Sequence, residues 1–239
     1  MLRVDAISKS FRGLKAVSSA SFEVPQGAIV ALIGPNGAGK TTCFNMIAGV
    51  FAPDSGSISF QDSFIQGLRP DQVCAAGIGR TFQIVKPFAG LSVLDNVMVG
   101  ALLRERTAAD ARSLSLSVLK KLRLEEKRDH PASALTLPDR KRLEVARALA
   151  TRPKLLLLDE VMAGLRPTEC DQMVEVFREL NRADGLTILL IEHVMRAVMA
   201  LAQRVVVLHH GEIIAGGAPA EVVRNPAVLE CYLGEETEV

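Results

Sequence analysis

The sequence predicts an α/β protein built on a parallel sheet, and three observations lead to this expectation. Continuously apolar runs at 28–34, 154–160 and 186–192 are typical of strands that are buried on both faces. Each run is followed by a segment with helical signals, as in folds whose helices cover both faces of a sheet. From about 90 to 150, strand signals fade and apolar residues take helical spacing. We therefore expect an α/β core with an inserted α-helical subdomain.

The first half of the chain alternates short apolar runs with turn residues. Proline and glycine at 25–27 separate two of these runs, and a glycine-rich loop precedes the first helical segment. The expected elements are strands at 2–8, 20–24, 28–34 and 56–60, a turn at 25–27 and a helix at 40–49.

The second half begins after two predicted helices at 107–123 and 139–150. Strands and helices then alternate again, with no internal repeat. The expected elements are a strand at 154–160, a helix near 168–182, a strand at 186–192, a helix near 193–202 and a hairpin at 204–214 that turns at His210 and Gly211. The whole chain, 1–239, is predicted to be one domain: 1–89 and 151–239 form the core with an antiparallel β subdomain, and about 90–150 form the helical subdomain.

Composition excludes several classes of protein. The formal net charge of the 239 residues is +1, which gives no field that favours nucleic acid as a partner. The four cysteines are far apart and form no CxxC pair, so we expect reduced thiols and no metal cluster. Between Arg104 and Arg147 there are 12 basic and 7 acidic residues, an excess that is typical of a solvated helical face.

Membrane segments are not expected. The amino terminus, "MLRVDAISKSF", lacks the apolar core of a signal peptide. The longest apolar runs are far shorter than the roughly 18 to 20 residues that a membrane span needs. Any membrane role is therefore expected to come through a partner.

A phosphate-binding loop is the strongest motif. "GPNGAGKTT" at 34–42 matches GxxxxGK[ST], with an apolar strand before it and a helix after it. Glycines let the backbone wrap closely around an anion, and the helix that follows adds positive potential. Lys40 is expected to reach the β- and γ-phosphates and Thr41 to supply a hydroxyl to Mg²⁺. The expected ATP-binding residues of the loop are Gly34, Asn36, Gly37, Ala38, Gly39, Lys40, Thr41 and Thr42.

Two carboxylates complete this chemistry. "KLLLLDE" is a buried strand that ends in Asp159 and Glu160. A carboxylate at the end of a strand beside a phosphate loop holds Mg²⁺, which fits Asp159, and the next one orients or deprotonates the attacking water, which fits Glu160. The sequence thus predicts an ATPase that uses Mg²⁺.

From these motifs onward, the chain resembles the ATP-binding subunits of ABC transporters nearly end to end. The resemblance implies a P-loop NTPase fold of the ABC ATPase type with a RecA-like core. It also implies three site residues. Phe11 in "SKSFRGLKAV" matches the aromatic residue that stacks on adenine, Gln83 in "GRTFQ" the glutamine that contacts Mg²⁺ and the attacking water, and His193 in "LLIEHV" the histidine that contacts the γ-phosphate.

One branch of the family is closest. "GRTFQ" followed by "LDNVMVG", and "RLEVARALATRPKLLLLDE", look like the ATPases of branched-chain amino-acid uptake systems. This likeness implies a head-to-tail dimer with a homologous ATPase, identical or different. It further implies docking on two membrane permease subunits, indirect work with an extracytoplasmic binding protein, and a cytoplasmic location on the inner face of the membrane.

The family's signature loop, ordinarily LSGGQ, aligns with residues 135–139, "LTLPD". In the family this loop caps the γ-phosphate on the opposite subunit. Thr136 keeps the hydroxyl, Leu137 replaces a glycine, and Pro138 has no N–H to donate but suits the first turn of a helix. Asp139 replaces the glutamine, and Arg140 and Lys141 are expected to offset its charge.

Three interpretations of this loop stay open. The site is active with altered signature chemistry, active only in a heterodimer whose partner has the usual signature, or inactive. Because Lys40, Gln83 and Glu160 are all present, the first interpretation is favoured. The altered loop of this chain would act on the nucleotide bound to the partner. The nucleotide bound to this chain would meet the partner's loop.

Other functions compete with amino-acid uptake. A lipopolysaccharide-export ABC ATPase has a similar sequence and differs in its membrane partners. A soluble ABC ATPase of translation or DNA repair usually carries two cassettes or long coiled coils, which 239 residues do not accommodate. The altered signature also suggests a further alternative, a regulatory ATP-binding module with weak ATP turnover.

Overall fold

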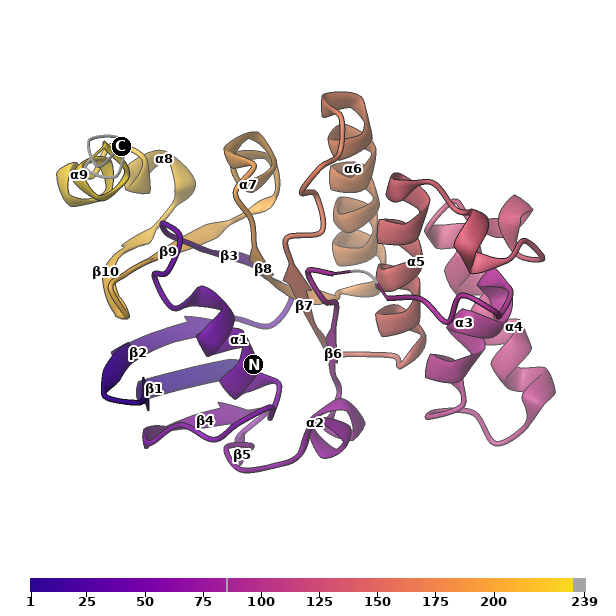
Figure 1. Cartoon of the computed structure of the whole chain (residues 1–239), viewed down its shortest axis with the longest axis horizontal. Coiled ribbons are helices and arrows are strands. Elements are labelled where there is room, and N and C mark those ends of the chain that lie inside the picture. The colour runs from indigo at the N-terminus through magenta and orange to yellow at the C-terminus, as the bar shows by residue number, and fades with distance from the viewer. Residues whose placement is uncertain (85, 234–239) are drawn as a thin grey trace. The chain divides into compact units, whose positions relative to one another are not determined.

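The predicted alternation of strands and helices is present in the computed structural model, which describes residues 1–84 and 86–233 (Figure 1). The chain forms two compact units. The first contains Met1–Val73 and the chain from Thr187 onward, and the second contains Cys74–Leu186. The helix α2 (Pro70–Ala76) leads from one into the other.

The first unit contains an antiparallel sheet at the amino terminus. Its strands lie in the order β2 (Leu14–Val24), β1 (Leu2–Phe11), β4 (Ser55–Phe60) and β5 (Ser63–Phe64). Apolar side chains such as Val4 and Ile58 are buried on one face, while Arg3 and Asp5 alternate with them on the other. This is the period-two pattern of a half-buried sheet.

The first unit also contains the strands that carry the phosphate loop. β3 (Ile29–Ile33) pairs in parallel with β8 (Thr187–Ile191) and β9 (Arg204–His209), and β10 (Glu212–Gly217) pairs antiparallel with β9. All residues of β3 and β8 are buried, as expected of apolar strands covered on both faces. The helices are α1 (Lys40–Ile47), α7 (Met195–Leu201), α8 (Pro219–Val222) and α9 (Pro226–Leu233).

The second unit combines two parallel strands with a helical assembly. β6 (Ile78–Arg80) pairs in parallel with β7 (Leu155–Asp159). α3 (Val93–Ala101) packs against α4 (Ala108–Lys121) and α5 (Leu137–Ala150). α6 (Pro167–Asp184) follows β7, and two short 3₁₀ helices, η1 (Glu125–Lys127) and η2 (Ala132–Ala134), lead from α4 to α5.

The expected elements lie close to the observed ones, with a few omissions. The sequence reading missed β5, β6, α2, α3, α8, α9 and the first half of β2. β2 was missed because its first residues have little apolar alternation, and its register against β1 shifts at several points. The boundaries of the helical subdomain, expected at about 90 and 150, remain a prediction.

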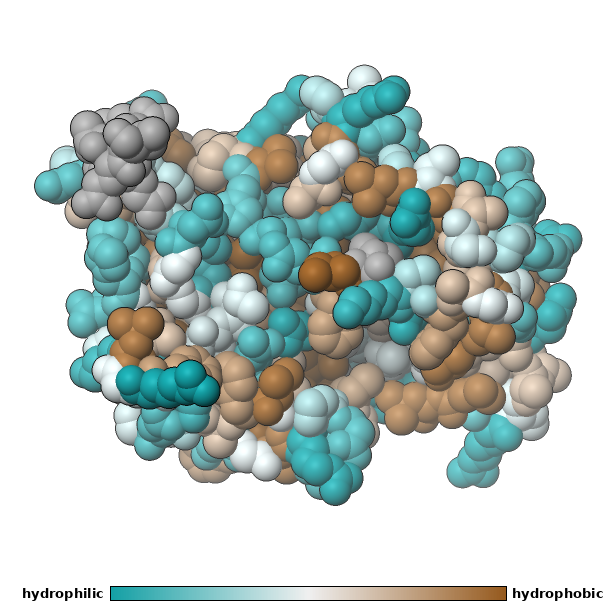
Figure 2. All heavy atoms as spheres, viewed as in Figure 1, coloured by the Kyte–Doolittle hydropathy of each residue, from teal (hydrophilic) through white to brown (hydrophobic). Residues whose placement is uncertain are grey.

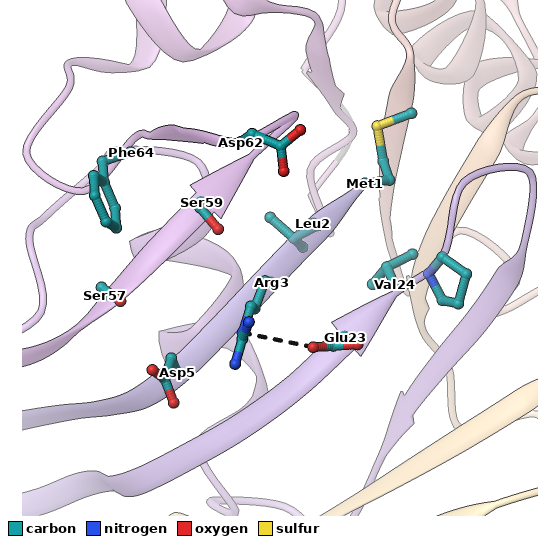
Figure 3. Close-up of a pocket in the computed structure, with 11 residues that line it drawn as sticks. Met1, Leu2, Arg3, Asp5, Glu23, Val24, Ser57, Ser59, Asp62 and Phe64 are labelled. Carbon is teal, nitrogen blue, oxygen red and sulfur yellow. Dashed lines mark ion pairs between the residues drawn. The ribbon is translucent and has the colours of Figure 1, made fainter.

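A pocket of about 580 Å³ lies along the antiparallel sheet (Figure 3). It contains the exposed ion pair of Arg3 and Glu23, whose nitrogen and oxygen lie 3.6 Å apart, together with Asp62 and the exposed Phe64. None of the predicted nucleotide-binding residues lines it. Among the described residues, no helix has the length and apolar character that crossing a membrane requires.

Candidate functional site

The phosphate loop joins the end of β3 to the start of α1, as predicted. Gly34 and Gly39 have φ angles of 150° and 104°, which L-residues with side chains rarely adopt. A Cβ at Gly39 would lie 2.3 Å from the carbonyl oxygen of Ala16, and one at Gly34 would lie 1.9 Å from that of Leu208. These two positions therefore require glycine both for backbone angle and for space.

Lys40 lies against the inside of this loop. Its side chain is buried, and Nζ donates hydrogen bonds to the carbonyl oxygens of Gly34 at 2.6 Å and Pro35 at 2.7 Å. A buried ammonium needs such partners, because an uncompensated charge away from water is costly. Among the other loop residues, Ala38 is buried, Gly39 and Thr42 are half-buried, and Asn36, Gly37 and Thr41 are exposed.

Phe11 and His193 also lie in the first unit. The Phe11 side chain is 42% exposed at the end of β1, and its ring meets that of Phe51 edge-on, with centroids 5.3 Å apart. Lys9 Nζ lies 5.9 Å from the centroid of Phe11. His193 is exposed two residues after the end of β8. Stacking on a base requires an accessible aromatic ring, and Phe11 is partly exposed.

Asp159 ends β7 in the second unit. Its carboxylate is buried and pairs with the Arg80 guanidinium, with Oδ2 at 3.2 Å from a guanidinium nitrogen. Burial raises the pKa of Asp159, although Arg80 acts in the opposite direction. Within residues 1–84 and 86–233, the other oxygen, Oδ1, is buried without a hydrogen-bond partner. An orphaned carboxylate oxygen is an acceptor of the kind that a hard divalent cation binds, so the residues present fit Mg²⁺.

Glu160 and Gln83 lie together in the second unit. The amide of Gln83 donates a hydrogen bond of 2.7 Å from Nε2 to Oε2 of Glu160. Glu160 has a φ of 49°, an uncommon backbone angle for a residue other than glycine. The structure thus brings two of the three predicted catalytic side chains into contact.

Lys141 holds the backbone around this pair. It is 5% exposed, and its ammonium donates to the carbonyl oxygen of Glu160 at 3.0 Å and to that of Gln83 at 3.5 Å. The solvated-face interpretation of the basic excess is therefore wrong for Lys141. Nothing in the local spacing distinguished it from its neighbours, because its partners are distant in sequence.

Further along α5, Arg147 contacts the segment after Gln83, and Glu144 accepts a hydrogen bond from the backbone of Phe82. Arg147 donates to the carbonyl oxygen of Lys86 at 3.1 Å and to Glu144 at 2.8 Å, and its guanidinium lies 4.9 Å from the ring centroid of Phe88. Burial raises the pKa of Glu144, and Arg147 partly offsets this effect. Spacing of three residues places Lys141, Glu144 and Arg147 on one side of the helix.

The signature segment leads into α5. The helix begins at Leu137, Thr136 lies at the N-cap position, and Pro138 falls in the first turn. Proline is accommodated there because the first helical N–H groups have no intrahelical acceptor. The Thr136 hydroxyl donates to Oδ2 of Asp139 at 2.7 Å.

The charge of Asp139 is compensated by different residues from those predicted. Lys127 binds Oδ2 of Asp139, and Arg142 lies 3.6 Å from its Oδ1. The expectation that Arg140 and Lys141 offset it is wrong: Arg140 donates to the carbonyl oxygen of Leu135, and Lys141 points to Gln83 and Glu160. Burial alone would raise the pKa of Asp139, but the hydrogen bonds from Lys127 and Thr136 lower it below its ordinary value.

The predicted site residues are therefore divided between the units. The first unit carries Phe11, the phosphate loop and His193, and the second carries Gln83, Asp159, Glu160 and the signature segment. Sequence reasoning missed Arg80 and Lys127, and it assigned Lys141 to Asp139 where the structure places it against Gln83 and Glu160. The functional assignment of all these side chains remains a prediction.

Comparison with known proteins gives consistent matches. The family described as ABC transporter matches residues 17–163, and the one described as branched-chain amino acid ATP-binding cassette transporter matches 212–238. The High-affinity branched-chain amino acid transport ATP-binding protein LivG of Salmonella typhimurium is 38% identical over 250 aligned residues that cover 98% of each chain. The lipopolysaccharide export system ATP-binding protein LptB of Escherichia coli is 36% identical, covering 96% of this chain and 95% of its own.

Solved structures agree. A nucleotide-free ATP-binding cassette from an ABC transporter superimposes with a TM-score of 0.89 at 30% identity, covering 97% of this chain and 98% of its own. An ATP-binding cassette in its ADP conformation also gives a TM-score of 0.89, at 31% identity and 98% coverage of both chains. The predicted fold is confirmed.

Proposed function

Because the chain belongs to the ATP-binding proteins of ABC transporters, we propose that it hydrolyses ATP to drive uptake of branched-chain or related amino acids through partner permeases. The contact of Gln83 with Glu160, directly after the buried Asp159, is the observation that carries the ATPase assignment. The substrate class is supported by full-length likeness to transport proteins for branched-chain amino acids and by the match at 212–238.

The proposed division of labour follows from each side chain's chemistry. The loop N–H groups and Lys40 bind the phosphates, Phe11 stacks on adenine, and His193 contacts the γ-phosphate. Thr41, Gln83 and Asp159 would hold Mg²⁺, which when bound would neutralise charge on the phosphates. Glu160 orients the attacking water and accepts its proton. The hydrogen bond from Gln83 would fix the orientation of the Glu160 carboxylate.

Partner binding is proposed from the surface of the second unit. Figure 2 shows hydrophobic atoms gathered over the region of α3 and α4. Exposed apolar side chains of this kind mark interaction surfaces when they gather in one region. We infer that they dock on membrane permease subunits, which hold the chain at the cytoplasmic face of the membrane, and that an extracytoplasmic binding protein delivers the amino acid. The exposed large apolar side chains between residues 82 and 103 are Phe82, Ile84, Phe88, Leu91, Val99, Leu102 and Leu103, and of these Val99 lies on α3.

The partner ATPase is proposed to be a second, homologous subunit, identical or different, in head-to-tail arrangement. In this arrangement, residues 135–139 of one chain act on the nucleotide of the other. A lipopolysaccharide-export function is the second candidate, because the chain is also 36% identical to LptB. The two functions differ in the membrane subunits that co-purify with the chain and in the transported molecule.

The decisive experiment uses the full transport complex in vesicles. Glu160→Gln should lower ATP turnover by about 100-fold or more, because a general base is removed, and should abolish uptake of labelled leucine. Glu179→Gln, an exposed carboxylate on α6, is the matched control and should leave both unchanged. Unchanged turnover in Glu160→Gln would contradict the ATPase mechanism, and leucine-independent turnover without uptake would contradict the substrate class.

A further inference from the structure

The signature segment lacks one donor that its predicted task requires. Pro138 has no N–H, and it lies in the first turn of α5, where free N–H groups point out of the helix end. A charge-assisted hydrogen bond to phosphate changes an equilibrium by about 10- to 100-fold. A functional loop therefore needs another donor at this place.

The ammonium of Lys127 lies beside Thr136 and Asp139 of the signature segment. This ammonium and the Thr136 hydroxyl both bind Oδ2 of Asp139, the hydroxyl at 2.7 Å. Two donors that share one acceptor atom lie next to each other. The Lys127 side chain is 43% exposed, whereas that of Asp139 is 7% exposed. An ammonium has three N–H donors, so bonds remain for a ligand on its exposed side.

The charges of the cluster also favour an anion. The carboxylate of Asp139 is in contact with two bases, Lys127 and Arg142. These three side chains carry a net charge of one positive unit, at the amino-terminal end of a 14-residue helix. Helix N-termini add positive potential of their own. The acidic substitution at position 139 therefore does not make this end of the helix negative.

The backbone around Lys127 is fixed rather than free. Lys127 ends η1, and the residues after it bond to the start of α3. Val93 N–H donates to the carbonyl oxygen of His130 at 2.9 Å, and Leu94 N–H donates to that of Arg128 at 2.9 Å. Asp139 then orients the ammonium itself. Pre-organisation of this kind lowers the entropy cost of binding.

We propose that Lys127 is a phosphate-binding residue of the divergent signature, supplying to the partner's nucleotide the donor that Pro138 lacks, with Asp139 as its positioning residue. This inference rests on the proposed function, since it needs residues 135–139 to face the partner's ATP. It goes further by assigning the contact to a residue outside the motif, eight positions before Leu135.

The test is a double-mutant cycle in the purified full transport complex. Lys127→Met should lower ATP turnover by about 10-fold or more in the native background. In the Pro138→Gly background, which restores the N–H, the same change should cost less than about 3-fold, because the two donors substitute for each other. Lys127→Arg keeps the charge and should retain turnover in both backgrounds. Lys120→Met, an exposed lysine of α4, controls for loss of charge.

A second measurement does not depend on turnover. In the Glu160→Gln variant, ATP-driven association of the chain with its partner, followed by light scattering, should require more ATP when Lys127 is replaced by Met. Thermal unfolding identifies variants that do not fold, and Lys127→Gln is the replacement if Met fails.

Equal losses in both backgrounds would mean that Lys127 only stabilises α5 and would overturn the proposal. Unchanged turnover and association in Lys127→Met would overturn it as well. Absence of turnover in the wild-type complex would instead contradict the proposed function itself.

Discussion

The phosphate loop and the signature segment bind the same kind of anion in the proposed mechanism, but they are built differently. At 34–42 the backbone forms the site: two glycines with φ angles of 150° and 104° fit against neighbouring carbonyl groups, and Lys40 bonds to the loop's own carbonyl oxygens. At 135–139 no glycine remains, and side chains from outside the motif surround Asp139. A site formed by the backbone tolerates few substitutions. In a site formed by side chains, a donor from another residue can replace one that is lost.

The largest effect is expected at the phosphate loop. Gly39→Ala places a Cβ 2.3 Å from the carbonyl oxygen of Ala16 in a backbone conformation with φ of 104°. Strain of this kind is worth about 1–3 kcal/mol per residue, so equilibrium binding should show ATP affinity reduced by up to about 100-fold. Gly37→Ala separates crowding from backbone strain, because Gly37 also has a positive φ, 77°, but no heavy atom lies within 4 Å of its Cβ position. Equal effects of both substitutions would show that crowding is not the cause.

A smaller effect is expected where the signature helix meets the catalytic pair. Lys141→Met leaves the carbonyl oxygen of Glu160 without its buried donor at 3.0 Å. Loss of a hydrogen bond to a charged group is worth about 1.5–3 kcal/mol. We expect kcat to fall by about 10- to 100-fold with little change in KM for ATP, because Lys141 positions Glu160 and does not touch nucleotide. A rise in KM at constant kcat would contradict this role.

Restoring the N–H group that Pro138 lacks should raise ATP turnover modestly, whereas the two substitutions above lower ATP affinity or turnover. Pro138→Gly adds one donor to the first turn of α5. Since Lys127 is proposed to fill that task already, turnover at the partner's site should rise by only about 2- to 10-fold. Steady-state ATPase assays of the complex measure it. Unchanged or lower turnover would show that the absent N–H does not limit the native loop.

Sequence reasoning located the features that depend on local pattern. The glycine loop, the strand predicted at 154–160 and the helix predicted at 139–150 follow from spacing and residue type, and the observed elements are Leu155–Asp159 and Leu137–Ala150. They were predictable because backbone angles, strand burial and helical periodicity are set by neighbours in the chain.

The charge compensation was not predictable in the same way. Asp139 pairs with Lys127, 12 residues earlier, and Asp159 with Arg80, 79 residues earlier. The packing of η1, β6 and α5 brings both partners into contact. From the sequence alone, the adjacent Arg140 and Lys141 were expected to be the partners of Asp139. Charge counts give the number of available partners, but tertiary structure selects among them.

The smallest effect is expected behind the phosphate loop, at Cys43, which is buried on α1. Burial raises the pKa of the Cys43 thiol to about 12, so at pH 8 only about one molecule in 10,000 carries the reactive thiolate. Cys74 is half-buried. N-ethylmaleimide at pH 8 should therefore modify Cys74 and leave Cys43 intact, with ATP affinity preserved, as peptide mass spectrometry measures. Modification of Cys43 at the same rate as Cys74 would mean that α1 opens readily. The phosphate loop, which is built from the backbone, would then be less rigid than the signature segment, which is built from side chains.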